Sequence, residues 1–211
     1  MKVRFFNPDA RTRTGLNRLP HWQQEGATYF VTYRLADSIP NGLLDRWMEE
    51  KAEWMANHPR PWSEDEEVEF QKRFTVRMDD LMDKGHGACV LRERKCRDVL
   101  VDSFARFDGD RYVLHSWVAM PNHVHVSFTL AEGVGLDLVV GGWKKFTARV
   151  INDLLGTKGA LWQKDYFDRM IRDWKHFMRV SRYISSNPKK AGLRKDEFTL
   201  WESDEVKRML G

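Results

Sequence analysis

Alternating apolar and polar positions predict four strands. β-Branched and aromatic residues concentrate over four stretches that are bounded by Gly, Pro, Asn or Asp: 28–35, 112–120, 123–130 and 161–171. The second and third stretches are separated only by Pro121-Asn122, so we expect them to form an antiparallel hairpin. The fourth stretch is preceded or interrupted by a loop.

Apolar residues at helical spacing predict five helices, over 43–58, 64–84, 90–107, 136–155 and 175–187. Ser63 precedes four acidic residues and is a candidate N-cap for the second helix. Pro188 is expected to end the last helix. Residues 1–26 are predicted to be a basic loop containing Arg11, Arg13 and Arg18, and residues 195–211 a polar tail.

The order of these elements predicts the fold. With the helical insertion at residues 37–110 counted as a single helical element, the chain reads strand, helix, strand, strand, helix, strand, helix. This order predicts an α+β, ferredoxin-like (split β-α-β) domain with an antiparallel sheet and helices on one face. The insertion falls between the first and second strands, and we expect residues 1–211 to form a single domain.

Composition excludes several classes of protein. The sequence is 42% hydrophobic, which is enough for a core, and it contains no run of 18 apolar residues that could cross a membrane. The N-terminus lacks an apolar signal core, so we expect a cytoplasmic protein. Cys89 and Cys96 lie in a helical pattern, about 10 Å apart along the axis, so we expect two reduced thiols.

Charge is distributed unevenly along the chain. Residues 45–84 carry 12 acidic and 7 basic side chains, whereas residues 141–195 carry 14 basic and 4 acidic side chains. A basic stretch of this size favours a polyanionic partner, although a solvated basic helix face is the simpler alternative. Aromatic residues within it favour nucleic acid: Trp143, Phe146, Trp162, Tyr166, Phe167 and Trp174.

Two histidines in the predicted hairpin are the first candidate site. His123 and His125 flank Val124, so on a strand their side chains point to the same face, about 6–7 Å apart along the chain. Two imidazoles side by side suit a divalent metal. The alternative is a pair of surface histidines.

The last predicted helix carries the second half of the candidate site. Tyr183 and Asn187 are four residues apart and share one helix face. A phenol, with a pKa of about 10, becomes a useful nucleophile when a metal polarises the phosphate that it attacks. The Asn187 amide oxygen would complete a His-His-Asn ligand set suited to Mg²⁺ or Mn²⁺. The alternative is that Tyr183 packs on the sheet and Asn187 caps the helix.

These motifs resemble a known family. The run from Met120 to His125 is similar to the histidine–hydrophobic–histidine (HUH) motif of single-tyrosine transposases. Further stretches resemble the REP-associated tyrosine transposase branch: Leu19 to Gln23, Ala27 to Thr32, Trp162-Gln163, Tyr166 to Arg169, Ile171 to Asp173, Arg182 to Ile184, Asn187-Pro188 and Ala191 to Leu193. The resemblance covers residues 19–36 and 111–194.

The resemblance implies a function. His123, His125 and Asn187 would hold the metal, and Tyr183 would attack single-stranded DNA to give a 5′-phosphotyrosine link and a free 3′-OH. The implied targets are palindromic repeats of bacterial genomes that fold into hairpins, which suggests a nucleoid-associated protein. Our candidates for DNA contacts are Lys144, Lys145, Arg149, Arg169, Arg172, Arg179, Arg182, Lys189 and Lys190.

Several alternatives remain at this stage. The chemistry also fits a replication initiator or relaxase, but 211 residues leave no room for the helicase or extra domains that such proteins usually carry. A non-catalytic nucleic-acid-binding module would instead need aromatic residues such as Tyr29 and Tyr33 on an open sheet face. The insertion could lie over the sheet, gate the DNA groove or pair with a second subunit as a homodimer.

Overall fold

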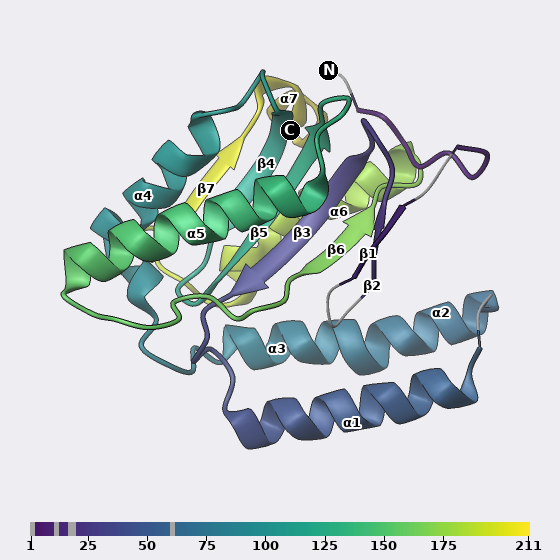
Figure 1. Ribbon diagram of the computed structural model, residues 1–211, viewed down its shortest axis with the longest axis horizontal. Coiled ribbons are helices and arrows are strands. Elements are labelled where there is room, and N and C mark those ends of the chain that lie inside the picture. The colour runs from purple at the N-terminus through teal and green to yellow at the C-terminus, as the bar shows by residue number, and fades with distance from the viewer. Residues whose placement is uncertain (1–2, 11–12, 17–19, 60–61) are drawn as a thin grey trace.

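A five-stranded antiparallel sheet forms the centre of the molecule (Figure 1). The computed structural model describes residues 3–10, 13–16, 20–59 and 62–211. The sheet order is β6-β3-β5-β4-β7. Its strands are β3 (Thr28–Arg34), β4 (Tyr112–Ala119), β5 (His123–Leu130), β6 (Phe167–Met170) and β7 (Thr199–Glu202).

The predicted ferredoxin-like topology is confirmed. Helix α4 (Arg94–Ala105) connects β3 to β4 after the insertion, and α5 (Leu136–Leu155) connects β5 to β6. Strands β6, β3, β5 and β4 lie in the order that a split β-α-β unit requires. Because α4 is part of this unit, the helical segments added to it are only those between β3 and α4.

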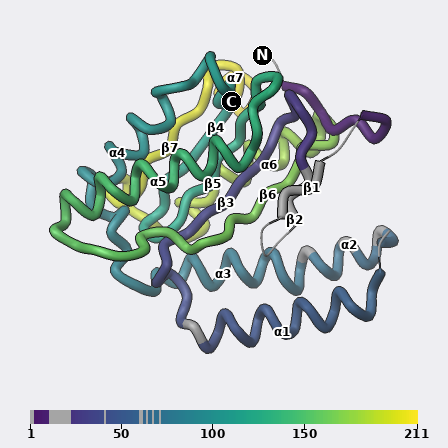
Figure 2. The backbone as a smooth tube through the Cα atoms, in the orientation of Figure 1, coloured from purple at the N-terminus to yellow at the C-terminus, as the bar shows by residue number. Residues whose placement is uncertain are grey.

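Helices cover both faces of the sheet, not one as predicted (Figures 1 and 2). Helices α4 and α5 pack on one face, over a core that includes Val124, Val126 and Phe128. Helices α6 (Trp174–Lys190) and α7 (Asp204–Leu210) cover the other face. The second face is covered because α6 carries a strong apolar stripe, with Phe177 and Ile184 fully buried on the sheet.

The C-terminal segment is a structured part of the sheet, so the predicted polar tail was wrong. β7 pairs with β4, and α7 follows it, capped by the Ser203 hydroxyl. The buried Arg97 of α4 anchors this segment by donating to the Asp196 carbonyl (2.7 Å) and to Thr199 Oγ1 (2.9 Å). All four residues of β7 are half-buried, so the strand has no alternating pattern that would reveal it in the sequence.

The insertion forms a separate layer beside one end of the sheet (Figure 2). The predicted second helix is three continuous segments in the structure. Ser63 and Glu66 form the predicted cap, with reciprocal bonds of 2.8 and 3.3 Å. The insertion comprises α1 (Asn41–Asn57), α2 (Glu64–Phe70), a π-helical stretch (Gln71–Val76), α3 (Arg77–Asp83) and a single 3₁₀ turn (Val90–Arg92).

Three local predictions need correction. Helix α6 continues through Pro188 to Lys190, because one missing N–H removes a single hydrogen bond. Cys89 has a left-handed φ of 48° and is not helical, although both cysteines are free thiols as predicted. The N-terminal stretch contains a small hairpin of β1 (Arg13–Leu16) and β2 (Pro20–Gln23), whereas Arg11 and Arg18 lie outside the described residues.

Among the described residues, no helix is both long enough and apolar enough to span a membrane.

Candidate active site

The histidine pair lies at the centre of the sheet, under α6. His125 pairs with Thr32 of β3, and the odd-numbered positions of β5 face α6 while the even-numbered positions face α5. The two imidazole rings are 4.7 Å apart, centre to centre, at 76° to each other. Both residues are at most 1% exposed. The pair therefore belongs to a buried site and is not a pair of surface histidines.

Hydrogen bonds leave the Nε2 atoms of both rings directed toward the site. Asn122 Oδ1 lies 2.8 Å from His123 Nδ1, and Thr32 Oγ1 lies 2.7 Å from His125 Nδ1. Burial lowers the pKa of His123 to about 3 and that of His125 well below its usual value, so both rings are neutral at pH 7. Neutral imidazoles whose Nδ1 is hydrogen-bonded to a neighbouring group are the usual form of a metal ligand.

Tyr183 reaches this pair from α6. Its hydroxyl lies 3.3 Å from His125 Nε2, and its ring packs edge-on against Phe30 (5.8 Å) and His125 (5.1 Å). Burial, followed by the negative charge of Asp79, raises the pKa of the phenol above its ordinary value. The hydroxyl is therefore protonated at neutral pH and must lose its proton in any nucleophilic step.

Asn187 lies one helical turn after Tyr183 and is 1% exposed. Neither its Oδ1 nor its Nδ2 has a hydrogen-bond partner within the described part of the chain, and the same is true of His123 Nε2. Buried polar atoms without partners are costly, and a bound ion is one way to satisfy them. The described residues contain no cluster of three His, Cys, Asp or Glu side chains, so a metal here would depend on the Asn187 amide.

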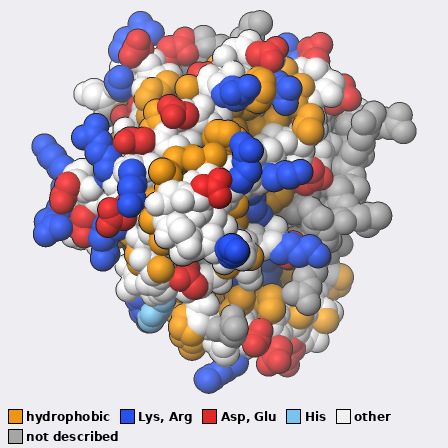
Figure 3. Space-filling view, turned by 60° about the vertical axis from the view of Figure 1, so that its left-hand side comes forward, with side chains coloured by type: hydrophobic (Ala, Val, Ile, Leu, Met, Phe, Trp, Pro, Cys, Tyr) orange, Lys and Arg blue, Asp and Glu red, His pale blue; other side chains and the backbone are white. Residues whose placement is uncertain are grey.

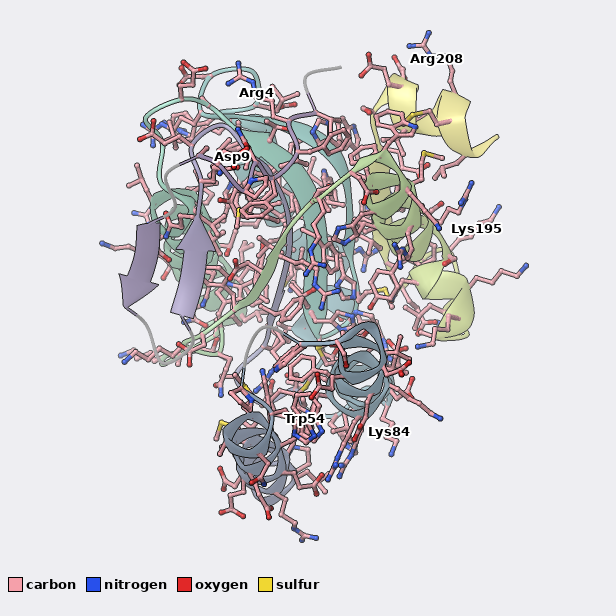
Figure 4. The ribbon with its side chains drawn as sticks, turned by 90° about the vertical axis from the view of Figure 1, so that its right-hand side faces the viewer. Arg4, Asp9, Trp54, Lys84, Lys195 and Arg208 are labelled. Atoms are coloured by element: carbon pink, nitrogen blue, oxygen red, sulfur yellow. The ribbon has the colours of Figure 1, made fainter. Side chains whose placement is uncertain are left out.

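The insertion contributes residues that sequence reasoning did not identify. The Asp79 carboxylate of α3 faces the Tyr183 hydroxyl, and burial raises the pKa of Asp79 to about 6. Lys190 at the end of α6 forms ion pairs with Asp80 (3.1 Å) and Asp83 (3.6 Å). Figure 4 shows α3, near Lys84, against this end of α6. The acidic run was visible in the sequence, but its position beside the tyrosine depends on tertiary structure.

The predicted DNA contacts fall on two sides of the molecule. Arg169, Arg172 and Arg179 surround His176 and lower its pKa to about 4, after the larger effect of burial. Together with the exposed Arg182, Lys189 and Lys190 of α6, they lie on the side of the histidine pair. The remaining three candidates, Lys144, Lys145 and Arg149, are on α5 across the sheet.

The α5 side carries mixed charges and does not continue the basic surface of the α6 side. Figure 3, which brings forward the left-hand side of Figure 1, shows Lys and Arg side chains interspersed with Asp and Glu. Lys144 donates to the Lys164 carbonyl (2.6 Å), and burial lowers its pKa to about 8. Six of the nine candidates thus lie on the side of the sheet that carries the histidine pair, and three lie on the other side.

Three of the six aromatic residues in the basic stretch are core residues. Trp143, Trp162 and Tyr166 are at most 6% exposed and pack between α5 and the sheet. Trp174 is 47% exposed at the start of α6, stacked on Phe177 at 5.4 Å. Only Trp174 of these four residues is therefore available for stacking on a base.

The fold and the site together define a ferredoxin-like domain in which a buried histidine pair on a central strand faces a tyrosine on a covering helix. Residues 93–187 match the model of the family described as "Transposase IS200 like". This match confirms the predicted resemblance over that segment, which begins at α4 and contains His123, His125, Tyr183 and Asn187. Over this segment the chain is similar to IS200-like transposases. Helices α1 to α3 lie outside the matched segment.

A solved structure titled "Structure of the REP associates tyrosine transposase bound to a REP hairpin" is similar to this chain, with a TM-score of 0.47 and 19% sequence identity. The similarity covers 85% of this chain and 77% of that one. No curated protein matches the sequence.

Proposed function

We propose that the protein is a metal-dependent endonuclease and strand transferase of single-stranded DNA, with Tyr183 as its nucleophile. The observation that carries this proposal is the 3.3 Å approach of the Tyr183 hydroxyl to His125 Nε2. These two groups are 58 residues apart in the sequence and come from elements that share no local structure. The family match over residues 93–187 supports DNA as the substrate.

The side chains present fit a divalent metal ion. The neutral Nε2 atoms of His123 and His125 and the unpartnered Asn187 Oδ1 would hold Mg²⁺ or Mn²⁺. When bound, this ion would polarise the scissile phosphate and shield its charge. Thr32 and Asn122 keep the two imidazoles oriented.

Tyr183 would perform the covalent step. Its oxygen attacks the phosphorus atom, the bond from phosphorus to the 3′-oxygen breaks, and that oxygen leaves as a 3′-OH after taking up a proton. The product is a 5′-phosphotyrosine link, and attack by a 3′-OH on this link reverses the step and joins strands. Asp79 faces the phenol and is placed to accept its proton.

We propose hairpin-forming palindromic repeats as the substrate, on the basis of the family resemblance and the basic surface around α6. Phosphate contacts would come from the cations on this side: Arg169, Arg172, Arg179, Arg182, Lys189 and Lys190. A non-catalytic binding module is not favoured, because Tyr29 and Tyr33 are at most 1% exposed and face α5, not solvent.

The test is cleavage of a labelled single-stranded hairpin oligonucleotide with Mn²⁺ or Mg²⁺. We expect a covalent protein–DNA adduct that is resistant to denaturation and is lost in Tyr183→Phe. Tyr166→Phe, which changes a tyrosine on the other side of the sheet, serves as the matched control and should retain the adduct. An adduct that persists in Tyr183→Phe would refute the assigned nucleophile.

A further inference from the structure

Asn122 occupies the tight turn between β4 and β5, directly before the first histidine. Its side chain is 1% exposed and forms three hydrogen bonds with other residues of the described chain. Its Oδ1 lies 2.8 Å from His123 Nδ1, while its Nδ2 donates to the carbonyls of Met82 (3.0 Å) and His86 (3.3 Å). The side chain thus links the end of α3 to the candidate metal ligand.

The contacts of the amide fix the direction of its hydrogen bond to the imidazole. Since Nδ2 is directed at two carbonyl oxygens, which can only accept, Oδ1 must be the atom that faces the ring. Oδ1 can only accept, so His123 must carry its proton on Nδ1. The Nε2 lone pair is then free, and this is the buried atom without a partner.

The backbone of the same turn is bound to both ends of the insertion. Leu91 N–H donates to the Pro121 carbonyl (3.2 Å), and Leu35 N–H donates to the Asn122 carbonyl (2.8 Å). Leu35, which follows β3, and Leu91, in the 3₁₀ turn that precedes α4, are therefore both hydrogen-bonded to the turn before His123. The insertion is consequently a structural support of this turn and not an appendage far from it.

We propose that Asn122 is a positioning residue that fixes the Nδ1–H tautomer of His123 and so leaves its Nε2 lone pair free for a metal ion. The inference rests on the proposed metal site. Outer-shell partners of this kind typically change metal affinity by about 10–100-fold when they are removed.

The first experiment measures the tautomer directly, without metal or DNA. Imidazole ¹⁵N chemical shifts of the full-length protein should show His123 protonated at Nδ1 in the wild type and a mixture of tautomers in Asn122→Ala. A wild-type ring protonated at Nε2, or an unchanged tautomer in Asn122→Ala, would overturn the proposal. This result does not depend on whether the protein cleaves DNA.

The second experiment distinguishes the role of the acceptor Oδ1 of Asn122 from that of its donor Nδ2. Asn122→Asp keeps an acceptor for His123 but loses both donors to Met82 and His86. We expect Mn²⁺ affinity, measured by calorimetry, to fall about 10–100-fold in Asn122→Ala and to be largely kept in Asn122→Asp. Hydrogen exchange of residues 82–88 should accelerate in both variants.

Asn152→Ala is the matched control, because Asn152 is an α5 asparagine that bonds only within its own loop region. Equal losses of Mn²⁺ affinity in Asn122→Ala and Asn122→Asp would leave Asn122 with a merely structural role and refute the proposal. The correct tautomer in a protein that binds no Mn²⁺ would instead contradict the proposed function and leave the positioning role intact.

Discussion

In the proposed function, DNA phosphates would contact the end of α6, where three aspartates of α3 lie. Asp80 and Asp83 hold the Lys190 ammonium, and Asp79 faces the Tyr183 hydroxyl. The candidate ligands behind them are at most 1% exposed. DNA that binds here as proposed would have to displace these contacts. The double variant Asp80→Asn with Asp83→Asn should therefore bind DNA with higher affinity.

The magnitude follows from the exposure of the ion pairs. The side chains of Lys190 and Asp80 are 47% and 57% exposed, and that of Asp83 is 14% exposed. Pairs of this kind contribute roughly 0.2–1 kcal/mol each, so losing both weakens the contact between α3 and Lys190 by about 1 kcal/mol. This corresponds to about a fivefold gain in DNA affinity, since about 1.4 kcal/mol is tenfold.

The assay is fluorescence anisotropy with a single-stranded hairpin oligonucleotide, without metal and in a Tyr183→Phe background. The control is Asp45→Asn with Asp65→Asn, which neutralises two exposed aspartates elsewhere on the insertion. Equal gains of DNA affinity in both double variants would show that the effect comes from net charge alone. No gain in Asp80→Asn with Asp83→Asn would refute the idea that these aspartates compete with DNA for Lys190.

Three further outcomes are expected. Thr32→Val removes a 2.7 Å bond to the second imidazole and should weaken Mn²⁺ binding about 10–100-fold in calorimetry, with an unchanged circular dichroism spectrum. Arg97→Met removes the anchor of β7 and should lower the free energy of unfolding in urea by about 3 kcal/mol, leaving buried carbonyls unpaired; a loss below 1 kcal/mol would contradict this account. Burial gives His115 and His123 folded pKa values of about 4 and about 3, below the ordinary value of 6.5. Above pH 6.5 both rings are neutral in the folded and in the unfolded chain, and full stability is present. Below pH 6.5 the unfolded chain takes up protons that the folded chain excludes, so the free energy of unfolding falls as the pH falls toward 4. Urea unfolding should therefore show a loss of about 2 kcal/mol for each at pH 5, and a flat profile between pH 7 and pH 5 would contradict it.

The sheet could be predicted because its strands carry a clear local signal. Residues 123–130 alternate between the two faces, and Pro121-Asn122 marks the turn, so the hairpin and its direction follow from the pattern alone. By contrast, β7 is four residues long with all of its side chains only half-buried, and its pairing with β4 depends on anchoring by Arg97. Such a strand has no periodic signal of its own.

The site was predictable to a similar extent. Side-chain alternation predicted that His123 and His125 share a face, and helical spacing predicted that Tyr183 and Asn187 share another. Neither rule predicts which residues of the insertion contact Tyr183. The contact of Asp79 with Tyr183 joins residues more than 100 positions apart, and it depends on how the insertion packs against α6.

Pro188 has a consequence for the motion of the helix that bears the tyrosine. Because proline lacks an N–H group, the bond that would join residue 188 to the Ile184 carbonyl cannot form. The turn that includes Tyr183 and Asn187 is thus one backbone bond weaker than its neighbours, although it lies in the middle of the site. If Tyr183 carries a DNA strand as proposed, the phenol would have to shift when that strand is exchanged for another, and this weakened turn is where α6 can bend at the lowest cost.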